Sequence, residues 1–279
     1  MPREYTGRKF SLPIFVTINT LSLAFLLSLL ALLAPDVWRA QLEAVWWSQL
    51  LTVGAAVLAY AFLEFFFHRY VLHAPLVPFL SYFYRQHTLH HALTRVRIKR
   101  VVSSTDAGIV ENFYPILEDP QHEASFFPWY TLVAFVGIFS SVYALLQWLL
   151  PSVPVFLGGI VGITCNLLMY EIFHMLEHKP LEKWLPLLEH PKYGAFWKQV
   201  YGFHLRHHAN VLCNESVSGF FGLPIPDWVF GTYVRSETLY PHGSIAIPTT
   251  FTPPTPRFIG WLDARALRAK NRRPKSVEK

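Results

Sequence analysis

Histidines gather in four short motifs of this sequence, which together hold ten of the 13 histidines. In chain order the motifs are His68 with His73, His87 with His90 and His91, His174 with His178, and His204 with His207 and His208. Residues three and four positions apart share a helix face, so each HxxHH triplet places imidazoles side by side. Neutral imidazole is a common metal ligand. We predict that all four motifs form one metal centre.

Helix geometry predicts that this centre holds two ions. His174 and His178 are four residues apart and can bind one ion together. His90 and His91 are adjacent and diverge by about 100° on a helix, so they suit two neighbouring ions. The same holds for the adjacent pair that ends the last motif.

Two further observations favour a pair of ions. His68 and His73 are five residues apart and diverge by roughly 140° on an α-helix, so we expect them also to serve different ions. A zinc site takes about three or four protein ligands, so ten histidines are too many for one ion. All-imidazole ligation suits zinc, copper, iron or nickel, and the residues alone do not choose among these metals.

Two carboxylates inside apolar stretches lie close to the motifs. Glu64 precedes His68 by four residues, and Glu171 precedes His174 by three. Carboxylates within a membrane are costly and are functional by default. We predict that each accepts the second N–H of a metal-bound imidazole and so fixes its tautomer. The alternative is that each carboxylate lies at the membrane interface and reaches water.

Composition indicates an integral membrane protein. Of the 279 residues, 52% are hydrophobic and 15% are charged, whereas soluble domains carry about 25% charged residues. Four apolar runs are long enough to cross a bilayer as helices, at about residues 12–34, 46–67, 126–150 and 155–173. We predict an all-α integral membrane fold of four transmembrane helices in two hairpins, with a cytoplasmic helical cap that holds the dimetal site.

The distribution of positive charge predicts the orientation. Of the 24 Lys and Arg residues, only Arg39 falls in the two short connections between spans. The positive-inside rule then places both termini and every histidine motif in the cytoplasm. The predicted boundaries are a cytoplasmic N-terminus at 1–10, one membrane-embedded domain at 11–263, and a basic, flexible tail at 264–279.

The net charge of +6 does not indicate nucleic-acid binding, because the basic residues follow the membrane topology rather than a binding surface. The basic run 95–100 is interpreted as a juxtamembrane patch that meets anionic lipid, or alternatively as a dock for an acidic electron donor. Cys165 and Cys213 predict neither a disulfide framework nor a thiolate metal site. Three histidines outside the motifs are expected in loops or at the surface: His122, His190 and His242.

The motifs resemble those of the fatty acid hydroxylase/sterol desaturase superfamily of integral-membrane di-iron oxidases. The matching segments are His68-Arg69 through His73, His87 through His91, Glu171 through His178, and His204 through His208. The later run from Asp227 to Tyr233 is similar to that family's DxxFGT signature. The resemblance covers roughly residues 55–235. The acidic residue before the HxxxH motif and Leu205 within the last motif look like those of fatty acid 2-hydroxylases, whereas the gap between His178 and His204 is longer than expected for them.

This resemblance implies two iron ions, with zinc as a substitute in recombinant material. It implies O2-dependent hydroxylation of a C–H bond in a membrane lipid. Eukaryotic members of the superfamily often carry a fused haem electron-carrier domain before the first span. Only ten residues precede that span here, so we expect the electrons to come from a separate donor protein. The alternative within the family is a sterol or carotenoid desaturase or hydroxylase. A membrane metal transporter is a distant alternative, since its ligands should lie at the bilayer midplane. A bis-histidine haem protein is a third alternative, but it needs paired single histidines deep in the spans, and the sequence has none there.

Overall fold

Four helices of the computed structural model, which describes residues 11–100 and 107–271, are long and apolar enough to cross a membrane. They are α1 (Leu12–Leu33), α3 (Trp46–Phe67) with its continuation η1 (His68–Leu72), α6 (Thr131–Leu149) and α7 (Val155–Glu177). Helices of the predicted length and apolar composition therefore form at all four predicted spans. The third span begins at Thr131 rather than at residue 126, because Phe127 precedes Pro128 and a residue before proline disfavours helix. The fourth span continues past residue 173 to Glu177.

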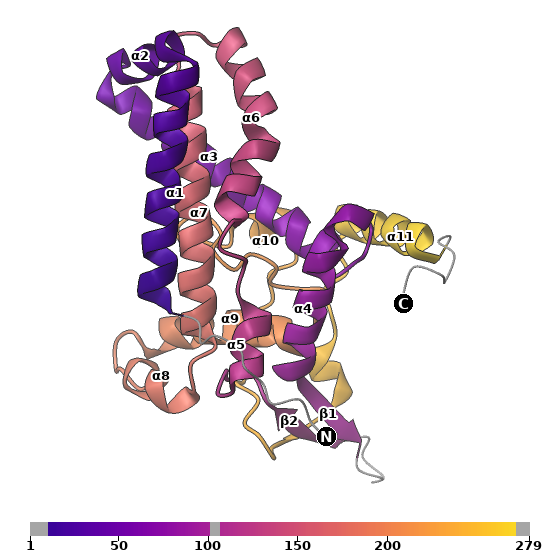
Figure 1. Cartoon of the computed structure of the whole chain (residues 1–279). Coiled ribbons are helices and arrows are strands. Elements are labelled where there is room, and N and C mark those ends of the chain that lie inside the picture. The colour runs from indigo at the N-terminus through magenta and orange to yellow at the C-terminus, as the bar shows by residue number, and fades with distance from the viewer. Residues whose placement is uncertain (1–10, 101–106, 272–279) are drawn as a thin grey trace, which may run out of the picture.

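Helix α7 is the centre of the bundle. It packs against α1, α3 and α6, as Figure 1 shows. Helices α6 and α7 therefore pack together, whereas α1 and α3 have their main partner in α7 rather than in each other. Gly158 and Gly162 lie where α7 crosses α3, and their lack of a side chain permits this close approach.

The short connection between α1 and α3 contains helix α2 (Pro35–Glu43). Buried Gln41 of α2 donates to Gln147 of α6 over 3.0 Å. The side-chain oxygens of these two glutamines accept the backbone N–H groups of Leu157 and Val155 in the first turn of α7. Amide side chains thus satisfy the free N–H groups of a helix that starts within the bundle.

The remaining elements form a cap at the end of the spans that carries the histidine motifs (Figure 1). They are η2 (Pro78–Leu80), α4 (Ser81–Leu93), β1 (Val96–Arg100), β2 (Gly108–Asn112), α5 (Asp119–Ser125), α8 (Leu181–Leu188), α9 (Gly194–Ala209), α10 (Ile225–Phe230), β3 (Ile245–Ala246), η3 (Pro248–Phe251) and α11 (Arg257–Asn271). The cap has its own apolar core, built around Val110, Tyr114, Trp184 and Leu205.

A small sheet in the cap corrects the prediction of an all-α fold. Strands β1, β2 and β3 form an antiparallel sheet in that order. In β1, buried Val96 alternates with exposed Arg97 and Lys99, which is the period of a half-buried strand. Because the exposed positions of this strand are basic, run 95–100 was interpreted by its charge and the alternation was missed. Figure 1 places β1 beyond α4, at the lower end of the cap, and the interpretation of run 95–100 as a juxtamembrane patch or a donor dock stays a prediction.

Helix α11 corrects the prediction of a flexible tail that begins at residue 264. The helix runs from Arg257 to Asn271, and Ile259 in its first half is fully buried. Asp263 accepts hydrogen bonds from Arg69, which fixes α11 against the end of the second span. The predicted N-terminus at 1–10 and the last part of the predicted tail, 272–279, lie outside the described residues.

The contact between α3 and α7 predicts that Gly158→Ala destabilises the protein. A Cβ atom at Gly158 would lie 2.9 Å from the Cβ atom of Thr52, so the two helices must separate. We expect a loss of about 1–3 kcal/mol, seen as a lower melting temperature in detergent. The matched control is Gly137→Ala in α6, where a Cβ meets nothing within 4 Å and alanine favours the helix. Equal melting temperatures for the two variants would contradict this packing.

Candidate metal centre

The ten motif histidines meet in two groups of five. Group 1 contains His68, His73, His87, His91 and His207, and group 2 contains His90, His174, His178, His204 and His208. Within each group the five ligand atoms lie within 4.8 Å of one another. Nitrogens that share one ion at about 2.0–2.1 Å stand roughly 3 Å apart, so a small adjustment of the rings brings each set around one ion.

Helices α4 and α9 divide their histidines between the groups in the same way. In α4, His87 and His91 lie in group 1 and His90 lies in group 2. In α9, the first and last histidines of the motif lie in group 2 and the middle one lies in group 1. Residues i and i+4 point one way and the residue between them points another. The prediction that adjacent histidines face two different sites is confirmed, and His174 and His178 share group 2 as expected.

The prediction for His68 and His73 was wrong, because both lie in group 1. The reason is the π-helical turn η1, in which the N–H of His73 donates to the carbonyl of His68 over 3.0 Å. In a π-helix the hydrogen bond spans five residues, so residues five apart lie closer to one face than they do in an α-helix. Such turns are frequent at functional sites, and here the turn aims two ligands at one point.

The outer nitrogens of five imidazoles have hydrogen-bond partners that fix their rings. The Nδ1 atoms of His68, His178, His207 and His208 contact the carbonyls of Glu215, Tyr114, Cys213 and Thr94, and Nδ1 of His90 contacts the hydroxyl of Ser125. A carbonyl accepts only, so those four Nδ1 atoms carry the hydrogen and donate. The hydroxyl of Ser125 donates to the carbonyl of Gln121 and can accept from His90. Metal-bound histidines usually have this kind of outer partner.

One pair of nitrogens shows why a cation fits this centre. Nε2 of His90 and Nε2 of His208 are 3.2 Å apart in group 2. Since Nδ1 carries the hydrogen in each neutral ring, two lone pairs face each other with no hydrogen between them. Burial lowers the pKa of both imidazoles well below the usual value, which keeps them neutral. A bound cation satisfies both lone pairs, and the residues present therefore fit metal ions.

The predicted roles of Glu64 and Glu171 were wrong: among the described residues, neither carboxylate hydrogen-bonds an imidazole. Glu64 accepts from the backbone N–H of Ser218 over 2.9 Å and from the Ser218 hydroxyl. Glu171 accepts from the N–H of Phe127 over 2.7 Å, where the chain enters α6. The outer nitrogen of His68, Nδ1, contacts the backbone carbonyl of Glu215 instead. The two carboxylates thus hold loops of the cap against the spans.

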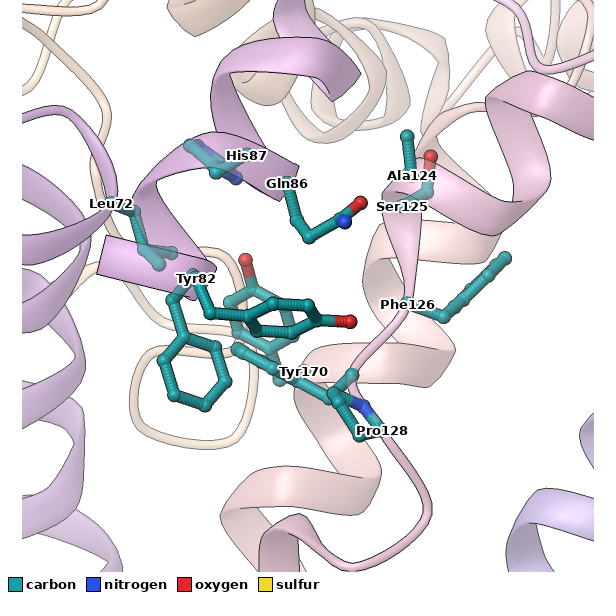
Figure 2. A pocket seen from close by; sticks show the side chains of 11 residues that line it. Leu72, Tyr82, Gln86, His87, Ala124, Ser125, Phe126, Pro128 and Tyr170 are labelled. Atoms are coloured by element: carbon teal, nitrogen blue, oxygen red, sulfur yellow. The ribbon is translucent and has the colours of Figure 1, made fainter. Parts of the chain in front are cut away.

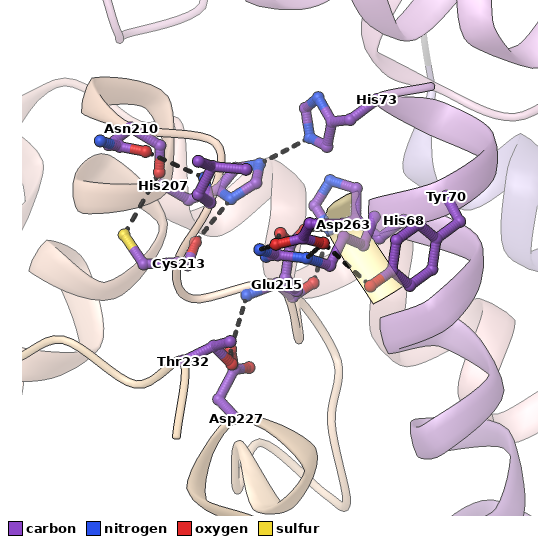
Figure 3. A network of polar contacts seen from close by, with 12 residues as sticks. His68, Tyr70, His73, His207, Asn210, Cys213, Glu215, Asp227, Thr232 and Asp263 are labelled. Carbon is purple, nitrogen blue, oxygen red and sulfur yellow. Dashed lines mark hydrogen bonds and ion pairs between the residues drawn. The ribbon is translucent and has the colours of Figure 1, made fainter. Parts of the chain in front are cut away.

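Behind group 1 lies a buried ionic network that the sequence did not reveal (Figure 3). Arg69 donates to Glu215 over 2.6 Å and to both carboxylate oxygens of Asp263. Tyr70 donates to the same Asp263. The carbonyl of Glu215 is the partner of His68, so this network fixes a ligand of group 1. The partners are separated from Arg69 by 146 and 194 positions, and no local pattern joins them.

The DxxFGT-like run has a structural role in this network. Asp227 accepts from the backbone N–H groups of Glu215 and Ser216 over 2.9 Å, and from the hydroxyl of Thr232 over 2.6 Å. Gly231 ends α10 with φ +69°, a conformation that favours glycine. The run therefore holds the segment whose carbonyl positions His68.

A pocket beside both groups opens between α4 and α7 (Figure 2). It is lined by Leu72, Tyr82, Phe83, Gln86, His87, Ala124, Ser125, Phe126, Phe127, Pro128 and Tyr170. His87 belongs to group 1, and Ser125 hydrogen-bonds His90 of group 2. Trp129 and Tyr130 follow the pocket directly and are 67% and 45% exposed at the start of α6, as expected of aromatic residues at a membrane interface.

The residues predicted to lie outside the centre do so. His122, His190 and His242 belong to neither group, and the two last accept backbone N–H groups in the cap. Cys165 and Cys213 are free thiols, as predicted.

Comparison with known proteins finds no relative: no family model, no curated protein and no solved structure matches the chain. Fold and site nevertheless define a class. The chain is a mostly helical protein with four helices suited to cross a membrane and with two adjacent histidine groups able to hold metal ions.

Metal content tests whether each group holds its own ion. We expect about two ions per chain in the wild type and about one in His207→Ala, which alters group 1, or in His174→Ala, which alters group 2. Elemental analysis of purified protein measures this, and the double variant should bind only traces. His190→Ala is the control and should keep both ions. Loss of all metal from either single variant would contradict two separately held ions.

Proposed function

We propose that this chain is an O2-dependent di-iron enzyme that hydroxylates a C–H bond of a membrane lipid, a fatty acyl chain or a related molecule. The observation that carries the proposal is the pairing of two all-histidine groups at the ends of membrane-suited helices, beside an aromatic pocket. The resemblance of the motifs to the fatty acid hydroxylase/sterol desaturase superfamily supports iron as the metal. Zinc can occupy the groups in recombinant protein.

The reaction consumes O2, two electrons and two protons for each C–H bond oxidised. One oxygen atom enters the C–H bond to give an alcohol, and the other leaves as water. Iron in the two groups would supply the activation of O2. A separate donor protein supplies the electrons. The histidines hold the ions, and the buried outer hydrogen bonds keep Nε2 of each oriented ring directed inward.

The chain's pocket supports a lipid substrate that enters from the bilayer. Leu72, Phe83 and Phe127 would contact an acyl chain, while Gln86 and Tyr82, which is 44% exposed, offer polar contacts. A lipid whose polar head group is held at the membrane interface, near Trp129 and Tyr130, would have its first acyl carbons beside His87. We therefore propose oxidation near the polar end of the lipid rather than at the chain terminus, with the centre and both termini in the cytoplasm.

A sterol or carotenoid desaturase or hydroxylase is the second candidate, because those members of the superfamily share the same core set of histidines. A metal transporter is disfavoured. Its ligands should lie along broken helices at mid-membrane. Here the histidines lie at the ends of two spans, in η1 and the last turn of α7, and in the cap helices α4 and α9.

Lipid analysis of cells with and without the protein tests the proposal. Cells that express the wild type under oxygen-18 should accumulate a lipid that carries one oxygen-18 atom near its polar end. His207→Ala and His174→Ala should reduce this product to the level of cells without the protein, whereas His190→Ala should not. A new double bond without label indicates the desaturase alternative. An unchanged lipid profile contradicts the enzyme assignment, and terminal hydroxylation contradicts the proposed substrate orientation.

A second arm of the same experiment tests the pocket. Gln86→Phe narrows it without touching a histidine, and displacement of the substrate should lower product on the order of 100-fold. Leu89→Phe adds bulk to an exposed position of the same helix and is the matched control. Metal content should be unchanged in both variants. Full activity of Gln86→Phe would place the substrate elsewhere.

A further inference from the structure

The helix α11 (Arg257–Asn271) presents a basic face that neither the histidine groups nor the pocket uses. Arg257, Arg265 and Arg268 are exposed, and Trp261 between them is 48% exposed. The guanidinium of Arg265 lies 4.2 Å from the centre of the Trp261 ring. The helix therefore offers several cations around one interfacial aromatic side chain.

The charge of this face is not neutralised from within the helix. Asp263 is the only acidic residue of α11. Its carboxylate is already bound by Arg69 and Tyr70, on the side of the helix that faces the protein. The charged residues on the exposed side of α11 are thus all cationic, and this side is complementary to an anionic partner.

The position of α11 identifies the partner as a membrane. Phe258 stacks on Phe230, and Phe230 in turn contacts Phe62, Phe65 and Phe66 in the last turns of the second span. Arg69, which holds Asp263, lies in the π-helical end of the same span. Figure 1 shows α11 running across the direction of α1 and α7. A helix fixed crosswise at the end of a span lies where a bilayer surface is found.

We propose that α11 is an interfacial helix whose face of Arg257, Trp261, Arg265 and Arg268 binds the head groups of anionic phospholipids. Helices of this kind place basic side chains among the head groups and an aromatic ring at their boundary with the acyl chains. Each basic residue near an anionic surface favours binding by about five-fold. The docked Asp263 holds this face in a fixed orientation, so little conformational freedom is lost on binding.

Hydrogen exchange of the full-length protein in lipid nanodiscs tests the proposal without any assay of metal or activity. The nanodiscs contain either phosphatidylcholine alone or phosphatidylcholine with phosphatidylglycerol. We expect slower backbone exchange in α11 when the anionic lipid is present. In Arg265→Gln/Arg268→Gln this extra protection should fall by about five-fold for each arginine removed.

The controls separate lipid binding from misfolding and from general charge effects. In neutral nanodiscs the double variant should exchange like the wild type, because Asp263 still docks the helix. Arg97→Gln/Lys99→Gln removes two charges from β1 and should keep the protection of α11. If the double variant is unstable, added salt should abolish the effect in the wild type, because it screens exposed charges. Equal exchange of wild-type α11 in the two lipids, or full protection in the double variant, overturns the proposal.

Discussion

The structure depends on one electrostatic constraint: buried imidazoles direct their lone pairs at one another, and a cation between them would satisfy those lone pairs. Each neutral ring has one hydrogen to donate, and in five of the ten rings a carbonyl or hydroxyl at Nδ1 takes it. The inner nitrogens then have nothing to donate, and in His90 and His208 they stand 3.2 Å apart. Buried polar groups without partners are costly. A cation in each group would remove that cost, so the arrangement is suited to metal binding.

The rest of the chain brings these rings to one place. The second span ends in a π-helical turn and α7 ends in His174 and His178, so two span ends deliver ligands directly. Helices α4 and α9 each present histidines to both groups, which keeps the groups adjacent. The outer partners come from loops that other residues hold, among them the segment braced by Asp227. Buried Arg69 then links this support to α11 through Asp263.

The features that depend on local geometry could be predicted from the sequence. The spans follow from apolar length, and the separation of His90 from His91 follows from the angle between adjacent residues on a helix. The pairing of His68 with His73 was missed because a π-turn is set by tertiary packing and leaves no residue pattern. The carboxylates Glu64 and Glu171 were misassigned because distant backbone groups compete for them. Arg69 and Asp263 lie 194 positions apart, and only the folded chain shows that they meet.

Anomalous diffraction at the absorption edge of the bound metal tests the central claim most directly. Crystals of protein purified with its native metal should give two peaks per chain, one among the inner nitrogens of His68, His73, His87, His91 and His207 and the other among those of His90, His174, His178, His204 and His208. A single peak bound by histidines of both groups, or peaks outside them with the ten rings directed elsewhere, would contradict the account.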